Sequence, residues 1–327
     1  MHWFNKRAFL KKVKEVGIDW KNVAVFHAHE ITYPLFVSGV KRRSQDLKIL
    51  LHFHSGPLVH LKTGRLGVLP LHSTLLYLFY RRNLELVDLP IFVSKRQQRL
   101  FGTWYAHGYL AETVDVRKGV WFGRFLRAFK LKPSIVLYNG IDTSVFNPVG
   151  RVSHADFRIG CVGNISENKD QMTLLRAARI LRGKGEKDFS VILVGSGDKL
   201  DECRSFVTEN GLEDVVEFRT EVDHLALPDF YRSLDLFVLP SWVEGFCCAA
   251  VEAAGCGTPI IGCRGVSIEE AIPEDDWPRW LITPKDADGL ADLIYQFRLL
   301  RPRQRLTGSF AMDDLVRQLL ASIQNVA

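Results

Sequence analysis

The chain has 327 residues, of which 47% are apolar and 24% charged, a composition that is typical of globular proteins and excludes a disordered chain. Its length suffices for two domains of about 150 residues each. No run of ~18 apolar residues occurs, which argues against a membrane-spanning helix. The first residues also lack the apolar segment of a signal peptide, so we expect a cytoplasmic protein.

The net charge of +6 conceals two halves of opposite sign. Residues 1–150 contain 23 basic and 9 acidic side chains, a net charge of +14, whereas the remainder contains 20 basic and 28 acidic, a net charge of −8. Basic surfaces attract the phosphates of lipid headgroups, lipid-linked substrates or nucleic acid. Since large apolar residues alternate with the basic ones, we expect an anionic membrane surface, and not nucleic acid, as a partner.

Two segments of the basic half are predicted to be amphipathic helices, the first 22 residues or so and residues 121–132. In the second segment, helical spacing places Phe122, Phe125 and Phe129 near one face. A helix lying peripherally on the inner face of the cell membrane and a core helix with a solvated face both fit this pattern.

Short apolar runs predict strands, and longer segments between them predict helices. The expected strands lie at residues 23–27, 49–53, 89–93, 134–138, 157–162, 191–194, 215–218, 236–239 and 259–262. Residues 171–182 are predicted to form a helix that buries Leu174, Leu175, Ala178 and Leu181. Buried strands alternating with helices indicate parallel sheets covered on both faces.

The strand pattern restarts after residues 147–154, which are predicted to be a linker. We therefore expect an α/β protein with two Rossmann-like, doubly wound domains that face a cleft. The first domain would comprise residues 1–149 and the second residues 150–327, with the last helix packing back on the first domain.

The six cysteines are predicted to be buried free thiols, because all have apolar neighbours and none stands in a C-x-x-C pair. They are Cys161, Cys203, Cys247, Cys248, Cys256 and Cys263.

The candidate residues for binding and catalysis lie mainly in residues 240–261. This segment follows a predicted strand, forms a turn and begins a helix near Phe246. Glu244 would lie in the turn and Glu252 about two turns into the helix. The amides of residues 245–247 and the helix N-terminus favour an anion. A diphosphate above the helix start, a sugar near Glu244 and a ribose diol at Glu252 form a consistent arrangement.

This segment resembles the E-x7-E signature of family 4 (group 1) retaining glycosyltransferases, which have the GT-B fold. Further segments resemble that family in its own order: residues 25–30, 51–56, 136–148, 162–171 and 191–198. The resemblance implies transfer of a hexosyl group from a nucleoside-diphosphate sugar with retention, without a metal or other cofactor. The acceptor would be a lipid-linked molecule or a polysaccharide in cell-envelope glycan synthesis.

The resemblance also implies roles for individual residues. Glu252 would bind the ribose, and Lys169 would bind the diphosphate. Glu244 would bind sugar hydroxyls near the reacting face, and His54 would face the donor sugar. Glu244, His54 and Lys169 are thus the candidate catalytic residues. The candidate donor-binding residues are Gly163, Asn164, Lys169, Gly195, Gly197, Gly245, Phe246, Cys247 and Glu252.

Two features depart from the family pattern. The family commonly has arginine where Asn164 follows Gly163, and asparagine brings no charge to the leaving group. The family also usually begins with a strand and a glycine-rich loop, whereas only about 22 residues precede Val23 here. We therefore expect an N-terminal domain that lacks these elements.

Other readings of these residues remain open. His54 could be a core histidine with satisfied hydrogen bonds, and for His27 and His29 that reading is preferred. Glu269 and Glu270 could bind donor or begin a helix. The one D-x-D, at Asp286, is predicted to cap a helix, so no metal site is expected.

Two other functions fit the same fold. One is a sugar-nucleotide epimerase or phosphorylase, against which the E-x7-E segment argues. The other is a sugar-nucleotide-binding or membrane-docking subunit with impaired catalysis, which Asn164 and the short N-terminus favour.

Overall fold

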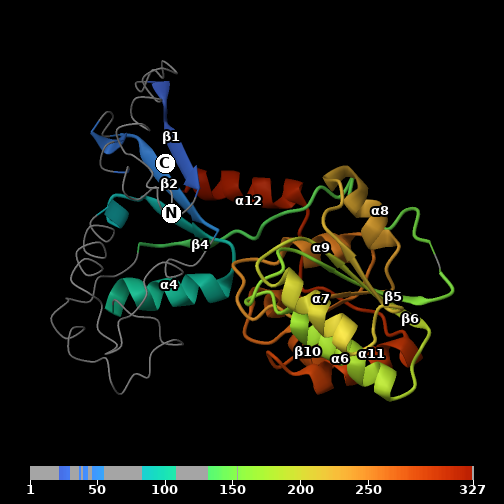
Figure 1. The fold of residues 1–327 in the computed structure, drawn as a ribbon. Helices are drawn as coiled ribbons and strands as arrows, with labels where there is room; N and C mark the ends of the chain where they lie inside the picture. Colours follow the sequence, from blue (N-terminus) through green and yellow to red (C-terminus); the bar gives the residue numbers. More distant parts are fainter. Residues whose placement is uncertain are drawn as a thin grey trace, which may run out of the picture. The chain divides into compact units, whose positions relative to one another are not determined.

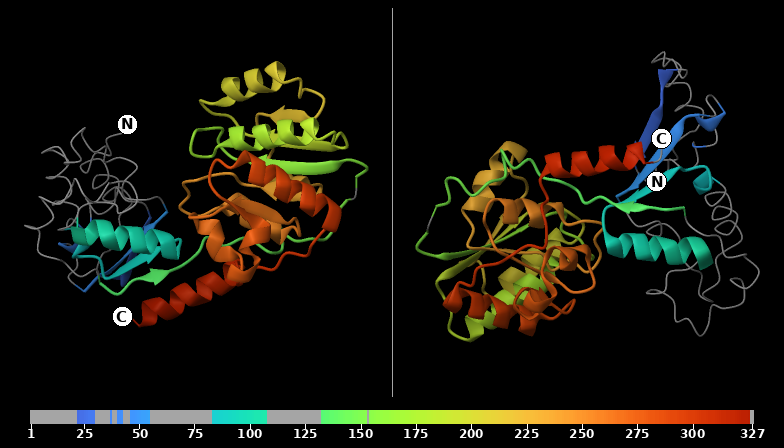
Figure 2. Two further views of the ribbon diagram at one scale, coloured as in Figure 1. Left: turned by 90° about the horizontal axis from the view of Figure 1, so that it is seen from below. Right: turned by 180° about the vertical axis from the view of Figure 1, so that it is seen from behind.

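A computed structural model of the protein describes residues 22–29, 37, 40–42, 46–54, 83–107, 132–152 and 154–325. The chain divides into two compact units (Figures 1 and 2). Unit 1 comprises Met1–Tyr138 with Val316–Ala327, and unit 2 comprises Asn139–Leu315. No helix among the described residues is both long and apolar enough to cross a membrane.

Unit 1 contains a parallel sheet in the order β1-β2-β3-β4. Its described elements are β1 (Val25–His29), β2 (Lys48–Phe53), β3 (Leu89–Phe92), α4 (Lys95–His107) and β4 (Ile135–Val136). The last helix, α12 (Met312–Gln324), begins in unit 2 and ends in unit 1. There Gln318 Nε2 donates a hydrogen bond to the Val136 carbonyl at 3.3 Å.

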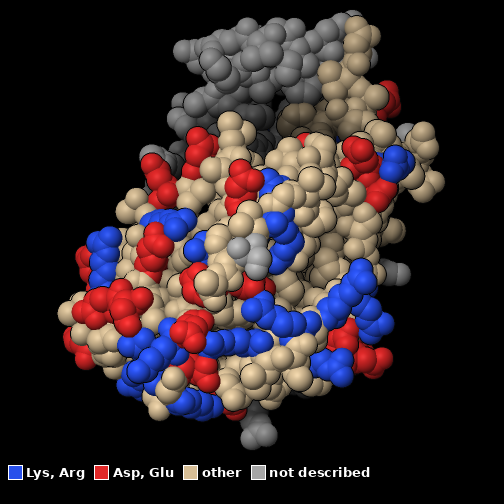
Figure 3. Space-filling view, turned by 90° about the vertical axis from the view of Figure 1, so that its right-hand side faces the viewer, with Lys and Arg blue, Asp and Glu red and all other residues tan. Residues whose placement is uncertain are grey.

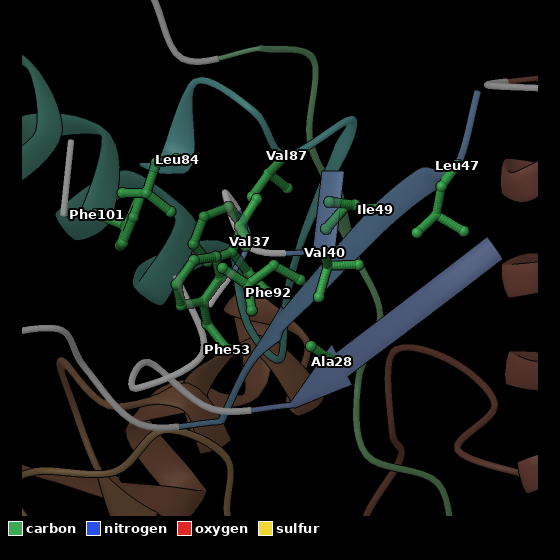
Figure 4. Packing of buried hydrophobic residues seen from close by; sticks show 11 residues of the cluster. Ala28, Val37, Val40, Leu47, Ile49, Phe53, Leu84, Val87, Phe92 and Phe101 are labelled. Carbon is green, nitrogen blue, oxygen red and sulfur yellow. The ribbon is translucent and has the colours of Figure 1, made fainter. Parts of the chain in front are cut away.

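The core of unit 1 lies on one face of this sheet (Figure 4). Because side chains alternate along a strand, Ala28 of β1 and Phe53 of β2 point into the core, while the histidines of both strands lie on the other face. The rings of Phe53, Phe92 and Phe101 lie 4.5 to 5.1 Å apart between centroids. These three aromatic side chains join β2, β3 and α4.

Unit 2 contains a six-stranded parallel sheet in the order β10-β9-β8-β5-β6-β7. Its strands are β5 (Phe157–Val162), β6 (Phe189–Val194), β7 (Val216–Arg219), β8 (Leu236–Val238), β9 (Ile260–Cys263) and β10 (Leu281–Ile282). Its helices are α6 (Gln171–Gly183), α7 (Leu200–Glu209), α8 (Leu227–Arg232), α9 (Cys248–Gly255), α10 (Trp277–Trp280) and α11 (Ala287–Leu300), with 3-10 turns η2 (His224–Ala226), η3 (Ser267–Ala271) and η4 (Glu274–Asp276).

The sheet of unit 2 is wound in both directions from its centre. The chain runs from β5 outward to β7, returns to β8 beside β5, and then runs outward to β10. Helices α6, α7 and α11 pack together, and α8 packs on α9 (Figure 1). The order of the strands therefore reverses between β5 and β8, the position where open α/β sheets bind ligands at the carboxyl ends of the strands.

Most of the predicted elements are present. The strand at 157–162 has the expected ends, and helix α6 buries all four predicted apolar residues, Leu174, Leu175, Ala178 and Leu181. The first strand lies two residues later than expected, and β10 was not predicted, because its two buried residues carry little pattern. Residues 121–131 and the first 21 residues lie outside the described part of the chain.

The segment predicted to be a linker is attached to unit 2. Arg151 donates hydrogen bonds to the Gly257 carbonyl, to Thr258 Oγ1 at 3.0 Å and to the Leu234 carbonyl at 3.0 Å. The compact units divide earlier, between Tyr138 and Asn139. The domain boundary at residues 149 and 150 stays a prediction.

All six cysteines are free, as expected, and five are buried. The expectation that all six are buried was wrong for Cys248, the first residue of α9, which is exposed.

Two loops at the carboxyl end of the sheet approach each other so closely that glycine is required. A Cβ atom on Gly195 would lie 2.0 Å from the carbonyl oxygen of Gly163, and Gly195 has a φ of 144°. Backbone atoms cannot retreat as a flexible side chain can, and L-residues avoid this region of φ. Gly195 therefore fixes the distance between the loops that follow β5 and β6.

We predict that Gly195→Ala lowers the stability of the protein by at least about 2 kcal/mol, through backbone strain and steric overlap. Gly183→Ala is the matched control, because Gly183 ends α6 and a Cβ there meets nothing within 4 Å. Thermal unfolding should show a lower Tm for the first variant and an equal or higher Tm for the second. Equal Tm values for the wild type and Gly195→Ala would contradict this account.

Candidate functional site

The strand reversal in unit 2 brings together two loops, residues 163–170 after β5 and residues 239–247 after β8. Trp242 joins them through two hydrogen bonds. Its backbone amide donates to the Asn168 carbonyl at 3.1 Å, and its indole Nε1 donates to the Glu167 carbonyl at 2.9 Å. The two loops thus form one connected surface at the carboxyl end of the sheet.

An ion pair lies between the same loops. Lys169 Nζ is 2.5 Å from Glu244 Oε1, and the two side chains are 26% and 8% exposed. This pair joins two of the three residues that the sequence identifies as catalytic candidates. A lysine held at this position offers a positive charge to an anion that enters the site.

Helix α9 begins at Cys248, two residues later than predicted, because Cys247 has non-helical backbone angles and its carbonyl accepts the first helical hydrogen bonds, from Ala250 and Val251. Glu252 is therefore the fifth residue of the helix, just over one turn from its start. The backbone amides of Gly245 and Cys247 donate to no acceptor among the described residues. These amides and the helix start favour an anion.

Glu252 is oriented by a buried tyrosine. The hydroxyl of Tyr231 donates to Glu252 Oε2 at 2.9 Å, and Tyr231 is fully buried. Burial raises the pKa of the Tyr231 phenol, and the charge of Glu252 raises it further. The phenol therefore stays protonated and remains a donor. A carboxylate has about four acceptor positions, so Glu252 keeps capacity for further hydroxyl groups.

Glu244 and Glu252 both act on the thiol of Cys248. Burial of the sulfur raises its pKa, and both carboxylates raise it further, against a hydrogen bond from Asn139 Nδ2 at 3.4 Å. Both predicted acidic residues are thus close enough to one thiol at the start of α9 to affect it electrostatically.

The glycines predicted to bind donor differ in their surroundings. Gly163 has a φ of 149°, and a Cβ there would meet nothing within 4 Å, so space is open beside it. Gly195 faces the backbone of Gly163, and a Cβ on Gly197 would lie 2.1 Å from the Ile165 carbonyl oxygen. The structure thus gives Gly195 and Gly197 a packing role, and donor binding by all these glycines stays a prediction.

The remaining predicted donor residues of unit 2 also have structural partners. Asn164 is exposed, and its carbonyl accepts a hydrogen bond from Gln171 Nε2 at 3.0 Å. The Phe246 ring lies 5.9 Å from the ring of Phe310, and Cys247 is buried. The exposed side chain of Asn164 is therefore accessible to a ligand, whereas the buried side chain of Cys247 is not.

A separate hollow lies beside the loop that follows β5. Its lining includes the cations Arg176, Lys199 and Lys285 and the acids Glu167 and Glu202. Lys199 pairs with Glu202 at 2.8 Å. On the face of unit 2 in Figure 3, basic and acidic side chains are interspersed, and neither sign covers the surface.

The third catalytic candidate, His54, belongs to unit 1 and follows β2. It is part of a group of four histidines at the ends of β1 and β2. His54 Nε2 lies 2.7 Å from His29 Nδ1, and the rings of His52 and His54 are 4.4 Å apart. The carboxyl ends of two parallel strands therefore present several imidazoles on one face.

Burial governs the charge of two of these histidines. Burial lowers the pKa of His27 to about 4, with His29 and His54 lowering it further. Burial lowers the pKa of His52 to about 3, and the other three histidines add to this shift, which the nearby backbone of Leu137 opposes. Both imidazoles are therefore neutral at pH 7.

The sequence did not single out His52. Its signal was the alternation H-F-H at the end of the strand, which places His52 and His54 on the same face. The pairing of His52 with His29 depends on the strand register, which the sequence does not give.

The remaining acidic candidates have local roles. Asp286 caps α11, as predicted, by accepting a hydrogen bond from the Gly289 amide at 2.8 Å. Glu269 lies in η3 and accepts a hydrogen bond from the Gly265 amide at 2.6 Å.

The region that contains these two loops matches a known protein family. Residues 148–308 match the family described as Glycosyl transferases group 1. The second half of the chain is therefore similar to group 1 glycosyl transferases. The match includes Gly163, Lys169, Glu244 and Glu252, and so contains both loops of the strand reversal.

Curated relatives match part of the chain. D-inositol 3-phosphate glycosyltransferase from Arthrobacter sp. (strain FB24) is 33% identical over 144 residues, which are 41% of this chain and 34% of the relative. The lipopolysaccharide core biosynthesis mannosyltransferase LpsB from Rhizobium meliloti (strain 1021) is 27% identical over 59% of this chain and 61% of its own. The chain spans about a third to a half of the length of the curated relatives it matches first.

Solved structures match nearly the whole chain. Sucrose-phosphate synthase from Thermosynechococcus elongatus has a TM-score of 0.72 at 19% identity, over 98% of this chain and 77% of its own. HepE from Anabaena in complex with UDP has a TM-score of 0.72 at 17% identity, over 97% of this chain and 82% of its own. The predicted α/β fold of the GT-B type is confirmed.

We predict that Lys169 and Glu244 stabilise each other. In a double-mutant cycle of Lys169→Met, Glu244→Gln and the double variant, urea unfolding should give a coupling energy of about 1–2 kcal/mol, since either single change leaves a largely buried partner alone. The exposed pair Lys199 and Glu202 is the matched control and should couple by less than about 0.5 kcal/mol. Additive effects at Lys169 and Glu244 would refute the pair's contribution.

Proposed function

We propose that the protein is a glycosyltransferase that moves a hexosyl group from a nucleoside-diphosphate sugar to an acceptor. The observation that carries this proposal is the ion pair of Lys169 and Glu244 at the strand reversal of a region that matches group 1 glycosyl transferases, beside the start of α9. Curated relatives that match part of the chain are named as a glycosyltransferase and a mannosyltransferase. HepE, which has the same fold, was solved with UDP.

In this proposal the nucleoside diphosphate lies at the carboxyl end of β5 and β8. The diphosphate is bound by the amides of Gly245 and Cys247, by the open backbone at Gly163 and by Lys169. The ribose hydroxyls donate to Glu252, which Tyr231 holds in place. Backbone amides and a cation of this kind stabilise a phosphate through short, charge-assisted hydrogen bonds.

Catalysis would depend on stabilising the nucleoside diphosphate as it leaves. The positive charge of Lys169 opposes the negative charge that develops on the leaving phosphate, and Asn164 supplies an uncharged donor beside it. Glu244 would accept hydroxyl groups of the sugar and fix its position, and His54 stays a candidate catalytic residue. We propose that transfer proceeds with retention and without a metal.

For the acceptor we propose a lipid-linked molecule or a growing polysaccharide of the cell envelope. The net charge of +14 in residues 1–150 supports it, because a basic surface attracts lipid-linked phosphates and anionic membranes. In this proposal the protein works peripherally on the inner face of the membrane.

One observation favours a second candidate, a sugar-nucleotide-binding subunit with impaired catalysis. Asn164 is exposed and uncharged at a position where the family that the sequence resembles commonly has arginine. Nucleotide binding without turnover would support this second function.

We predict that Glu252→Ala weakens binding of UDP by about 10- to 100-fold, because two hydrogen bonds from ribose to a carboxylate are lost. Isothermal titration calorimetry measures this. Tyr231→Phe keeps the carboxylate and removes only its orienting hydroxyl, so a loss below tenfold is expected. The exposed Glu213→Ala should leave affinity unchanged. Unchanged affinity in Glu252→Ala would reject Glu252 as the ribose ligand.

We predict that Glu244→Gln lowers kcat by about 100-fold and leaves UDP affinity within threefold or tighter. The substitution removes the charge that positions the sugar and frees Lys169 for the diphosphate. Release of UDP from a panel of UDP-sugars measures turnover. Wild-type turnover in Glu244→Gln would exclude this role, and weaker UDP binding with normal kcat would reverse the roles given to the two glutamates.

A further inference from the structure

Three histidines of unit 1, His27, His29 and His52, have no role in the proposed transfer. In the parallel register of β1 and β2, His29 lies opposite His52, and His27 precedes them by two residues on the same face. The rings of these three histidines lie 4.3 to 5.7 Å apart between centroids. Three imidazoles therefore converge at the carboxyl ends of two adjacent strands.

Three buried ring nitrogens of this cluster have no hydrogen-bond partner in the part of the chain that the structure describes. His52 is only 5% exposed, and neither of its ring nitrogens has a hydrogen bond of good geometry among the described residues, although the backbone of Leu137 lies near enough to raise the pKa of the imidazole. The third nitrogen is His27 Nε2. Buried polar atoms in native proteins are nearly always paired, and leaving one unpaired costs about 1–3 kcal/mol. The expectation that His27 and His29 are core histidines with satisfied hydrogen bonds is therefore wrong for His27, and it is also wrong for His29, which is exposed.

We propose that His27, His29 and His52 form a binding site for a divalent transition metal, of which Zn²⁺ is the expected ion. Three neutral imidazoles and an open fourth position are a common zinc ligand set. The site uses residues of unit 1 only, and the residues proposed to bind the nucleotide diphosphate and ribose are in unit 2.

The geometry is close to that of an occupied site. One ring nitrogen from each of the three histidines lies within 4.8 Å of the other two. Three nitrogens bound to one tetrahedral Zn²⁺ at about 2.1 Å lie about 3.4 Å apart. An inward movement of each ring nitrogen by at most about 0.8 Å, through rotation of the imidazoles, therefore completes the site.

Metal binding would also affect the neighbouring His54. His29 Nδ1 contacts His54 Nε2, so a metal either takes the other nitrogen of His29 or replaces this contact. In the first case His54 becomes the outer partner that orients a metal ligand. The proposal thus adds a metal centre beside a candidate catalytic histidine, and it stands whether or not that histidine takes part in transfer.

The test is metal binding by the full-length, untagged protein after removal of metals with a chelator. Calorimetry with Zn²⁺ should detect one saturable equivalent per chain, and Co²⁺ should give the visible absorption of a four-coordinate site. His29→Ala should weaken Zn²⁺ binding by at least tenfold. His29 is exposed, so this variant should fold, which far-UV circular dichroism checks. His52→Ala should abolish Zn²⁺ binding. If His52→Ala does not fold, His27→Ala replaces it and should likewise abolish Zn²⁺ binding.

The matched control is His224→Ala, an exposed histidine of unit 2 outside the cluster, which should bind Zn²⁺ as the wild type does. Binding of UDP is measured separately on the same samples, so that failure of the nucleotide site and failure of the metal site are distinguished. Absence of a saturable equivalent in the wild type would overturn the proposal. The proposal would also be overturned if Zn²⁺ affinity fell equally in His29→Ala and His224→Ala, or if it did not fall in His29→Ala.

Discussion

The proposed site depends on the reversal of strand order between β5 and β8. This reversal places the ends of two strands side by side without a helix between them, and it brings Lys169 and Glu244 together although 75 residues separate them in sequence. The ion pair and the two hydrogen bonds of Trp242 hold the loops together. An anion that enters the site would find the lysine and the backbone amides already in position, so little reorganisation is required.

The same loops explain where α9 begins. Trp242 and Glu244 attach residues 239–247 to the loop that follows β5. The helix begins only after this attached segment, at Cys248. Glu252 consequently lies one turn from the start, where Tyr231 of α8 reaches its carboxylate. The close approach of Gly195 to the Gly163 carbonyl also brings the loops after β5 and β6 together. Backbone contacts therefore position these loops, and the loops carry the charged side chains.

The sequence predicted the fold well and the site in part. Apolar runs located every described strand except β10, and helix α6 followed from its apolar spacing. The sequence identified Glu244 and Lys169 separately, but their pairing depends on the order of strands in the sheet. His52 was missed for a related reason, since its contact with His29 is fixed by the register of two parallel strands. Long-range order and register are properties of the folded sheet, and periodicity does not report them.

A crystal structure of the full-length protein with UDP tests the central claim most directly. We expect the diphosphate within hydrogen-bond distance of Lys169 Nζ and of the amides of Gly245 and Cys247, with the ribose on Glu252. A diphosphate bound instead in the hollow lined by Arg176, Lys199 and Lys285, with Glu252 free of ribose, would contradict the account.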